Sequence, residues 1–366
     1  MRDTAKKTPE LRFSGFCGDW EQRKLGEVAE IRSGRDYKHL NKGNIPVYGT
    51  GGSMLCVDEA LSYNVDAIGI GRKGTIDKPF LLKAPFWTVD TLFYVIPSSN
   101  YDLYFINNIF QTVNWKMYDE STGVPSLSKT AISKVTVLTP KLIEQVKLGN
   151  FFKQLDQILS LHQQKLDQLE LMKKGFLQQL FPENGEKIPK VRFANFEDEW
   201  EQRKLGDLVN ITTGKLDANA MVKNGQYDFY TSGIKKYKIN TPAFKGPAIT
   251  IAGNGATIGY MHLADGRFNA YQRTYVLTDF NDDRQFIFSS IGNNLPHKIA
   301  QEARTGNIPY IVMDVLSELK LHICELEEQH RIGTLFKNLD KQITLHQQKI
   351  EKLKSIKKAL LQKMFI

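Results

Sequence analysis

The chain has 366 residues, of which 41% are hydrophobic and 24% charged, and its formal net charge is +9. This length exceeds one ordinary core and predicts two domains. No run of about 18 apolar residues occurs, and the N-terminus lacks the apolar stretch of a secretory signal, so we expect a cytoplasmic protein without a membrane span. Three scattered cysteines lack metal-ligand spacing and predict reduced thiols rather than a metal site. The basic charge is compatible with an anionic partner such as nucleic acid but does not specify one.

An internal repeat organises the chain. The heptapeptide WEQRKLG stands at residues 20–26 and again at 200–206. Further matched segments follow in the same order in both halves: IRSG (31–34) with ITTG (211–214), AIGIGRKGTI (67–76) with AITIAGNGATI (248–258), STGVPS (121–126) with RTGNIPY (304–310), and EQVKLGNFFKQLDQILSLHQQK (144–165) with EQHRIGTLFKNLDKQITLHQQK (328–349). The repeat predicts two copies of one unit of about 180 residues, fused head to tail.

Each copy begins with a globular part. Segments 86–97 and 273–280 are rich in aromatic and β-branched residues and predict strands, whereas segment 101–113 predicts one or two helices. These short mixed runs, separated by Gly and Pro, indicate an α+β domain.

Each copy ends with a helical heptad stripe, typical of a left-handed coiled coil. The stripe residues are Leu155, Leu159, His162, Leu166, Leu169, Phe176 and Leu180 in the first copy, and Leu339, Ile343, His346, Ile350, Leu353, Leu360 and Met364 in the second. The repeat predicts pseudo-two-fold symmetry and therefore an antiparallel pair of helices. Full overlap would set Leu155 against Met364, Leu159 against Leu360, Leu166 against Leu353, His162 against Lys357, and Lys173 against His346. These polar residues could fix the register, or they could simply point toward solvent.

The resulting fold class is α+β, with two pseudo-symmetric globular domains separated by two long helices that form an antiparallel coiled coil. The expected boundaries are 1–142 for domain 1, 143–181 for helix 1, 182–188 for a linker, 189–326 for domain 2, and 327–366 for helix 2. The stripe from Leu155 to Leu180 would span about 39 Å. This is roughly one turn of B-DNA, so the helix pair could act as a ruler between two DNA contacts.

Motifs for catalysis by this chain are not convincing. GIGRKG (69–74) fits a dinucleotide-binding glycine pattern, but a turn and strand are expected after it instead of a helix, and TIAGNG (250–255) breaks the spacing. We expect a tight turn that either lets the backbone approach DNA phosphate or is an ordinary surface turn. NIPY (307–310) and GVPS (123–126) are near-misses of an adenine-methyltransferase motif and predict loops. No catalytic residue is therefore assigned.

The repeated lead-ins PELRFSGF and PKVRFANFEDEWEQRKLGDL, the LHQQK helices and the endings FLQQLF and LLQKMF resemble the specificity (S) subunit of type I restriction–modification enzymes across essentially the whole chain. The resemblance implies two target recognition domains, each reading one half of a bipartite asymmetric DNA site. It also implies that the helices set the spacer and dock two modification subunits, with which restriction subunits assemble. S-adenosylmethionine, ATP and Mg²⁺ are then expected in those partners, and the chain itself is a non-catalytic subunit.

DNA recognition needs Arg, Lys, Asn or Gln at base edges and cations or hydroxyls at phosphates. Loops beside the matched motifs offer such candidates: Arg35, Lys38, Tyr48, Thr50, Arg72, Lys73, Lys116 and Thr122 in the first copy, and Lys215, Tyr230, Ser232, Lys235, Lys236, Asn254, Arg273 and Thr305 in the second. For each residue the alternative is an ordinary exposed side chain. The alternative for the whole chain is a non-enzymatic scaffold with two ligand-binding domains on a coiled-coil stalk.

Overall fold

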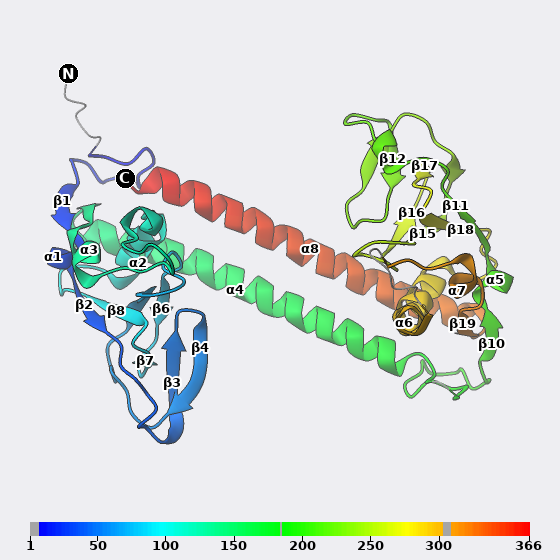
Figure 1. Ribbon diagram of the computed structural model, residues 1–366, viewed down its shortest axis with the longest axis horizontal. Helices are drawn as coiled ribbons and strands as arrows, with labels where there is room; N and C mark the ends of the chain where they lie inside the picture. The colour runs from blue at the N-terminus through cyan, green and yellow to red at the C-terminus, as the bar shows by residue number, and fades with distance from the viewer. Residues whose placement is uncertain (1–6, 184, 303–308) are drawn as a thin grey trace. The chain divides into compact units, whose positions relative to one another are not determined.

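The computed structural model describes residues 7–183, 185–302 and 309–366. The chain forms two compact units, the first made of residues 1–163 and 348–366 and the second of residues 164–347 (Figure 1). Each unit therefore contains a globular part together with portions of both long helices. Among the described helices, none is long and apolar enough to cross a membrane.

Unit 1 contains two main sheets. One has the order β2-β8-β5-β6 and the other β4-β3-β7, and β1 pairs with β9. The strands are β1 (Glu21–Lys24), β2 (Ala29–Ser33), β3 (Lys42–Gly49), β4 (Gly52–Val57), β5 (Ala67–Gly71), β6 (Phe80–Leu82), β7 (Trp87–Thr88), β8 (Leu92–Pro97) and β9 (Thr136–Thr139). The helices are α1 (Leu25–Val28), α2 (Leu103–Thr112), η1 (Trp115–Tyr118), α3 (Lys129–Lys134) and α4 (Leu142–Gln179).

Unit 2 repeats this plan. One sheet has the order β11-β18-β15-β16 and the other β13-β12-β17-β14, and β10 pairs with β19. The strands are β10 (Glu201–Lys204), β11 (Asn210–Thr213), β12 (Tyr227–Tyr230), β13 (Tyr237–Ile239), β14 (Phe244–Lys245), β15 (Ala248–Ala252), β16 (Met261–Ala264), β17 (Arg267–Ala270), β18 (Thr274–Thr278) and β19 (Lys320–Ile323). The helices are α5 (Leu205–Leu208), η2 (Ala218–Ala220), α6 (Arg284–Glu302), α7 (Met313–Ser317) and α8 (Leu326–Met364).

Local sequence explains the central elements of each unit. Strands β5 and β15 are buried along their whole length, as expected for short apolar runs at the centre of a sheet. Helix α2 begins at Asp102, whose Oδ1 accepts a hydrogen bond from the Phe105 N–H at 2.8 Å. The strands and helix expected within 86–97, 273–280 and 101–113 are thus confirmed as β7 and β8, β18, and α2.

The two long helices run antiparallel within each unit. In unit 1, Phe152 of α4 packs on Phe365 with ring centroids 5.6 Å apart, and Asp156 Oδ1 lies 2.6 Å from Lys357 Nζ. Moving forward along α4 therefore means moving backward along α8. Figure 1 shows the C-terminal end of α8, in red, beside α2 and the first turns of α4.

Unit 2 contains the corresponding contacts. Phe181, which follows α4, lies 6.1 Å from Phe336 of α8 between ring centroids, and Lys173 Nζ lies 2.5 Å from Asp340 Oδ1. All fourteen stripe residues named from the sequence are buried or half-buried. The antiparallel prediction is confirmed in both units.

The two stripe lysines have carboxylate partners that the stripe positions did not predict. Lys357 Nζ of α8 donates to Asp156 Oδ1 of α4 at 2.6 Å. Lys173 likewise pairs with Asp340. Carboxylates of the facing helix are available at lower cost, because an opposite charge compensates a half-buried ammonium and a histidine does not.

Each core is closed by the end of the long helix that comes from the other copy of the repeat. In unit 1 the buried Phe365 lies 5.4 Å from Phe105 and 6.3 Å from Trp20 between ring centroids. In unit 2 Phe181 lies 5.5 Å from Phe286 and 6.0 Å from Trp200. The Trp shared by both WEQRKLG motifs is therefore a core residue against which a helix end packs.

Candidate nucleic-acid interface

A turn at the end of the central strand gives unit 1 its candidate interface. This strand-end turn comprises residues 72–76 after β5. The Arg72 N–H donates to the Thr91 carbonyl at 2.8 Å, the Arg72 carbonyl accepts from the Leu127 N–H at 2.9 Å, and the Gly74 N–H donates to the Pro125 carbonyl at 2.8 Å. Gly74 has a φ of +95°, a backbone conformation that glycine adopts at little cost. The turn is therefore tied to two neighbouring segments and held in one shape.

Unit 2 builds the same strand-end turn from residues 253–257 after β15. The Gly253 N–H donates to the Arg273 carbonyl at 2.8 Å, the Gly253 carbonyl accepts from the Ile311 N–H at 2.9 Å, and the Gly255 N–H donates to the Pro309 carbonyl at 2.9 Å. Gly255 has a φ of +86°. The tight turn expected at GIGRKG is confirmed, and its counterpart shares its hydrogen bonds despite the altered glycine spacing.

The strand-end turns of the two units have the same backbone arrangement but carry different side chains. The backbone of Lys73 forms an isolated antiparallel β-bridge with Ser126 in unit 1, and the backbone of Asn254 forms the same bridge with Tyr310 in unit 2. The carbonyl that anchors each turn belongs to Thr91 in unit 1 and to Arg273 in unit 2. One backbone arrangement thus displays two different chemistries.

A groove of about 780 Å³ opens beside the strand-end turn of unit 1. Its lining includes three cations and five hydroxyl groups, and Glu120 is the one acid among the described lining residues: the cations are Arg72, Lys73 and Lys129, and the hydroxyls are Ser33, Ser121, Thr122, Ser126 and Ser128. Cations and hydroxyls are the groups that contact phosphate oxygens in protein–DNA complexes. The groove is chemically suited to an anionic backbone.

Asp119 shapes the loop on one side of this groove. Its Oδ1 accepts hydrogen bonds from the Ser126 N–H at 2.9 Å, the Ser121 N–H at 3.0 Å and the Ser121 hydroxyl at 2.8 Å. These bonds, the Ser126 one foremost, lower the pKa of the Asp119 carboxyl because they stabilise its charged form. The loop that carries Thr122 is therefore fixed from within.

Polar side chains also surround the turn of unit 2. The Ser232 hydroxyl donates to Asn254 Oδ1, and the Thr257 hydroxyl donates to the Ser232 carbonyl. Asn254 is half-buried, whereas Lys235, Lys236 and Arg273 are exposed. In unit 1 the side chain of Thr50 lies beside Gly74, because a Cβ built on that glycine would be 3.8 Å from Thr50 Oγ1.

The structure thus gathers several predicted residues around each turn. Unit 1 brings together Thr50, Arg72, Lys73 and Thr122, and unit 2 brings together Ser232, Asn254 and Arg273. Arg35 and Lys215 lie on the segments that follow β2 and β11, where the Arg35 N–H donates to the Thr88 carbonyl and the Gln272 N–H donates to the Leu216 carbonyl. Ser126 and Tyr310 were not named, although the match of STGVPS with RTGNIPY pairs them.

Other candidates do not lie free at this surface. Tyr230 is only 2% exposed and packs on Phe268, and burial raises its pKa to about 12. Tyr48 is half-buried against Phe80. Both rings therefore pack against aromatic side chains of their own units.

The remaining candidates have varied surroundings. Lys116 forms a 3.0 Å ion pair with Asp77 and lowers the pKa of that carboxyl. Lys38 is exposed, and its N–H donates to Asp36 Oδ1 at 3.5 Å. Thr305 lies outside the described residues.

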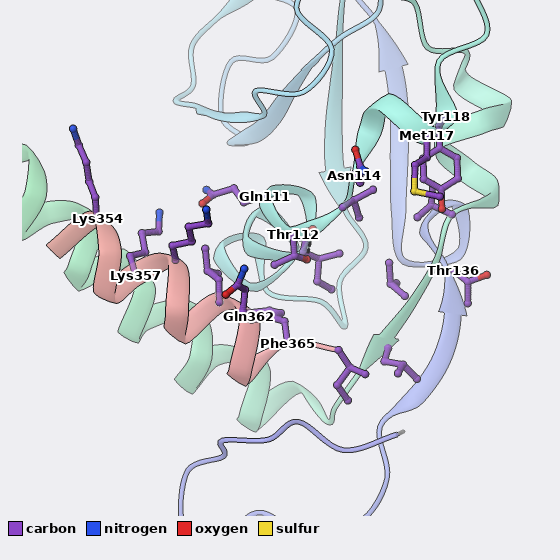
Figure 2. A pocket seen from close by; sticks show the side chains of 18 of the residues that line it. Gln111, Thr112, Asn114, Met117, Tyr118, Thr136, Lys354, Lys357, Gln362 and Phe365 are labelled. Atoms are coloured by element: carbon purple, nitrogen blue, oxygen red, sulfur yellow. Dashed lines mark hydrogen bonds between the residues drawn. The ribbon is translucent and has the colours of Figure 1, made fainter. Parts of the chain in front are cut away.

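A second groove of unit 1, about 730 Å³ in volume, lies near the end of α8. It is lined by Lys357, Lys358 and Gln362 of α8, by Gln111 and Thr112 of α2, and by Met117 of η1, among others (Figure 2). Figure 2 shows Lys354 and Lys357 projecting from α8, and Phe365 at the end of that helix. Two of the three lysines that line this groove are paired with carboxylates, Lys357 with Asp156 and Lys354 with Glu351.

Comparison with known protein families decides the classification. The model of the type I restriction modification DNA specificity domain matches residues 18–171 and again residues 197–355. The chain belongs to this family. The two matches coincide with the two copies of the repeat, so each copy is one specificity domain.

Curated relatives of this family include two named specificity subunits. The chain is 33% identical over 160 residues to the type I restriction enzyme EcoDI specificity subunit of Escherichia coli, and 22% identical over 282 residues to the MjaVIII specificity subunit of Methanocaldococcus jannaschii. The first match covers 44% of this chain and 35% of the relative, and the second covers 67% and 65%.

A solved structure shares the fold of the specificity domains described above. The crystal structure of a type I restriction-modification system S subunit from M. genitalium matches with a TM-score of 0.79 over 98% of this chain and 99% of that one. The sequence identity is 15%, so this likeness establishes the fold alone.

Proposed function

We propose that this chain is the DNA specificity subunit of a type I restriction–modification complex, in which each unit reads one half of a bipartite, asymmetric duplex site. One observation carries the proposal beyond family membership. The strand-end turns of the two units share their backbone hydrogen bonds yet display different side chains, Lys73 in one and Asn254 in the other.

The chemistry around the turns supports DNA as the ligand. Contacts to phosphates position a protein on a duplex, whereas contacts to base edges specify the sequence. The cation- and hydroxyl-lined groove of unit 1 offers the first kind of contact. Lys73 and Asn254 offer the second, and because they differ, the two half-sites should differ and the target should not be a palindrome.

Partner subunits would supply the reaction. Modification subunits would bind S-adenosylmethionine and methylate adenine, and restriction subunits would use ATP and Mg²⁺. This chain would contribute the choice of sequence and a docking surface for two modification subunits.

Exposed apolar residues of the long helices support two equivalent docking surfaces. Unit 1 exposes Leu161 of α4 and Ile356 of α8, which are 65% and 39% exposed. Unit 2 exposes their counterparts in the repeat, Leu345 of α8 and Met172 of α4, at 39% and 45%. Equivalent apolar pairs in both units fit two copies of one partner.

Co-expression with the cognate modification subunits tests the DNA-reading function. N6-methyladenine mapped across the host genome should reveal one bipartite asymmetric motif that disappears when this chain is omitted. Active modification subunits that give no new motif with this chain would refute the proposal.

A pair of variants tests the docking surface. Leu161→Glu should weaken co-purification of modification subunits, because it places a charge in an apolar contact. Ile143→Glu is the matched control: Ile143 is 77% exposed, and the corresponding position of α8 already carries a glutamate, Glu327. If the two variants co-purified modification subunits equally well, Leu161 would be excluded from the interface.

A further inference from the structure

We infer that Lys73 and Asn254 are equivalent base-reading residues, Lys73 selecting a guanine in one half-site and Asn254 an adenine in the other. This inference rests on the proposed function and assigns one base pair to each unit. It starts from the backbone: both residues occupy the position before a positive-φ glycine, in an antiparallel bridge to Ser126 and Tyr310, respectively.

Lys73 is available to an acceptor. Within the described chain it forms no ion pair and no side-chain hydrogen bond, and it lines the groove of unit 1. The neighbouring Arg72 is more restrained, since its guanidinium lies 5.9 Å from the centroid of the Phe93 ring and donates to the Asp90 carbonyl at 3.4 Å. An ammonium group has three donors and no acceptor, which suits the O6 and N7 acceptors of guanine.

Asn254 presents the complementary chemistry in unit 2. Its side chain carries both a carbonyl oxygen and an NH₂ group, and an amide of this kind pairs with N6 and N7 of adenine. Ser232 donates to its Oδ1, which retains a second lone pair for the adenine amino group. Thr257 in turn donates to the Ser232 carbonyl, so the plane of the amide is set before DNA arrives.

Ser232 is therefore a positioning residue. Its counterpart near the turn of unit 1 is Thr50, whose hydroxyl lies beside Gly74. A lysine is flexible and does not need its orientation fixed, whereas an amide reads a base only in the correct plane. This difference explains why, in unit 2, Ser232 donates a hydrogen bond to Asn254 and accepts one from Thr257.

Exchange of the two side chains in the complete complex tests the inference. The motif methylated with the native chain is determined first; if no bipartite motif appears, the proposed function itself fails. With Asn254→Lys, we expect one position of one half-site to change from adenine to guanine, with a preference of about tenfold or more, while the other half-site and the spacer stay the same. Lys73→Asn should make the reciprocal change in the other half-site.

Two further variants separate base reading from charge and from structure. Asn240→Lys adds the same charge to an exposed residue that follows β13. This residue lies at the open end of the β12–β13 hairpin, whereas Ser232 lies in its turn, so the motif should stay unchanged. Ser232→Ala should relax selection at the same base pair as Asn254→Lys without affecting other positions. An unchanged motif with Asn254→Lys, a uniform loss of methylation over all sequences with Ser232→Ala, or a change at several positions would overturn the inference.

Discussion

The Arg192 guanidinium donates two hydrogen bonds to the Glu328 carboxylate, 2.7 Å from Nε to Oε1 and 2.8 Å from Nη2 to Oε2. The carboxylate is fully buried, and the Arg192 side chain is 12% exposed. Unit 1 contains the same clamp, since Arg12 binds Glu144 with two contacts of 2.7 Å. In each unit the clamp ties the segment before WEQRKLG to the first turn of a long helix.

Removing the guanidinium should destabilise unit 2 strongly. Arg192→Met leaves Glu328 buried without its cation, and breaking a buried pair in this way costs about 3 kcal/mol or more. Chemical unfolding of the purified chain measures the loss. Lys187→Met is the control, because Lys187 and Glu199 form a pair that is 64% and 62% exposed and should contribute little to stability. Equal losses in both variants would contradict the account.

Phe365, next to the last residue, should stabilise unit 1 and not unit 2. Phe365 packs against Phe105, Phe152 and Trp20, so Phe365→Ala should cost about 3–5 kcal/mol by creating a cavity. Hydrogen exchange followed by mass spectrometry should show lost protection in residues of unit 1. The neighbouring Ile366, which is 46% exposed, provides the control Ile366→Ala.

The repeat supplies a second control for this closure. Phe181→Ala should remove protection from unit 2, where Phe181 contacts Phe286 and Trp200. If both phenylalanine variants loosened the same unit, the assignment of helix ends to cores would be wrong.

These closures mark the limit of what the sequence could predict. The matched motifs predicted two similar α+β domains and antiparallel helices, since repetition and heptad spacing are local signals. The role of Phe365 could not be read in this way, because its partner Trp20 lies at the other end of the chain and no local pattern links them. The sequence placed FLQQLF and LLQKMF at helix ends but did not assign them to a core.

In the candidate site, too, local sequence patterns predict some features and miss others. Lys73 and Asn254 could be named as equivalent positions because they stand within matched segments, and their role as base readers stays a prediction. The burial of Tyr230 could not be predicted, since strand alternation does not anticipate that the consecutive residues Phe229 and Tyr230 are both buried. The charged partners of Lys173 and Lys357 were missed as well, because stripe positions alone do not reveal the flanking Asp340 and Asp156.

Acidification should weaken unit 2 through the half-buried His262. Burial lowers the pKa of His262, which packs between Tyr230 and Tyr260 and has Lys236 and Asp228 as its nearby charges. Because the folded-state pKa lies below the unfolded value of about 6.5, the unfolded chain binds the proton more readily. Stability is therefore full above that value and decreases as the pH falls through it.

The histidine effect can be isolated by substitution. Thermal unfolding between about pH 7.5 and pH 5.5 should show a smaller decline for His262→Gln than for the native chain. His297→Gln, which changes an exposed histidine of the same unit, should leave the slope as it is. A native slope retained in His262→Gln would assign the pH dependence to other groups.

Two glycines of the same helix should respond in opposite ways to alanine. A Cβ built on Gly149 of α4 would lie 2.1 Å from Asp102 Oδ1, the atom that caps α2, and 3.1 Å from the Phe105 nitrogen. A Cβ on Gly175 of α4 would have no neighbour within 4 Å. Gly149→Ala should therefore destabilise the chain by displacing the cap, whereas Gly175→Ala should stabilise it by up to about 1 kcal/mol through higher helix propensity. Chemical unfolding distinguishes the two, and stabilisation by both variants would show that α2 is not held against α4 at Gly149.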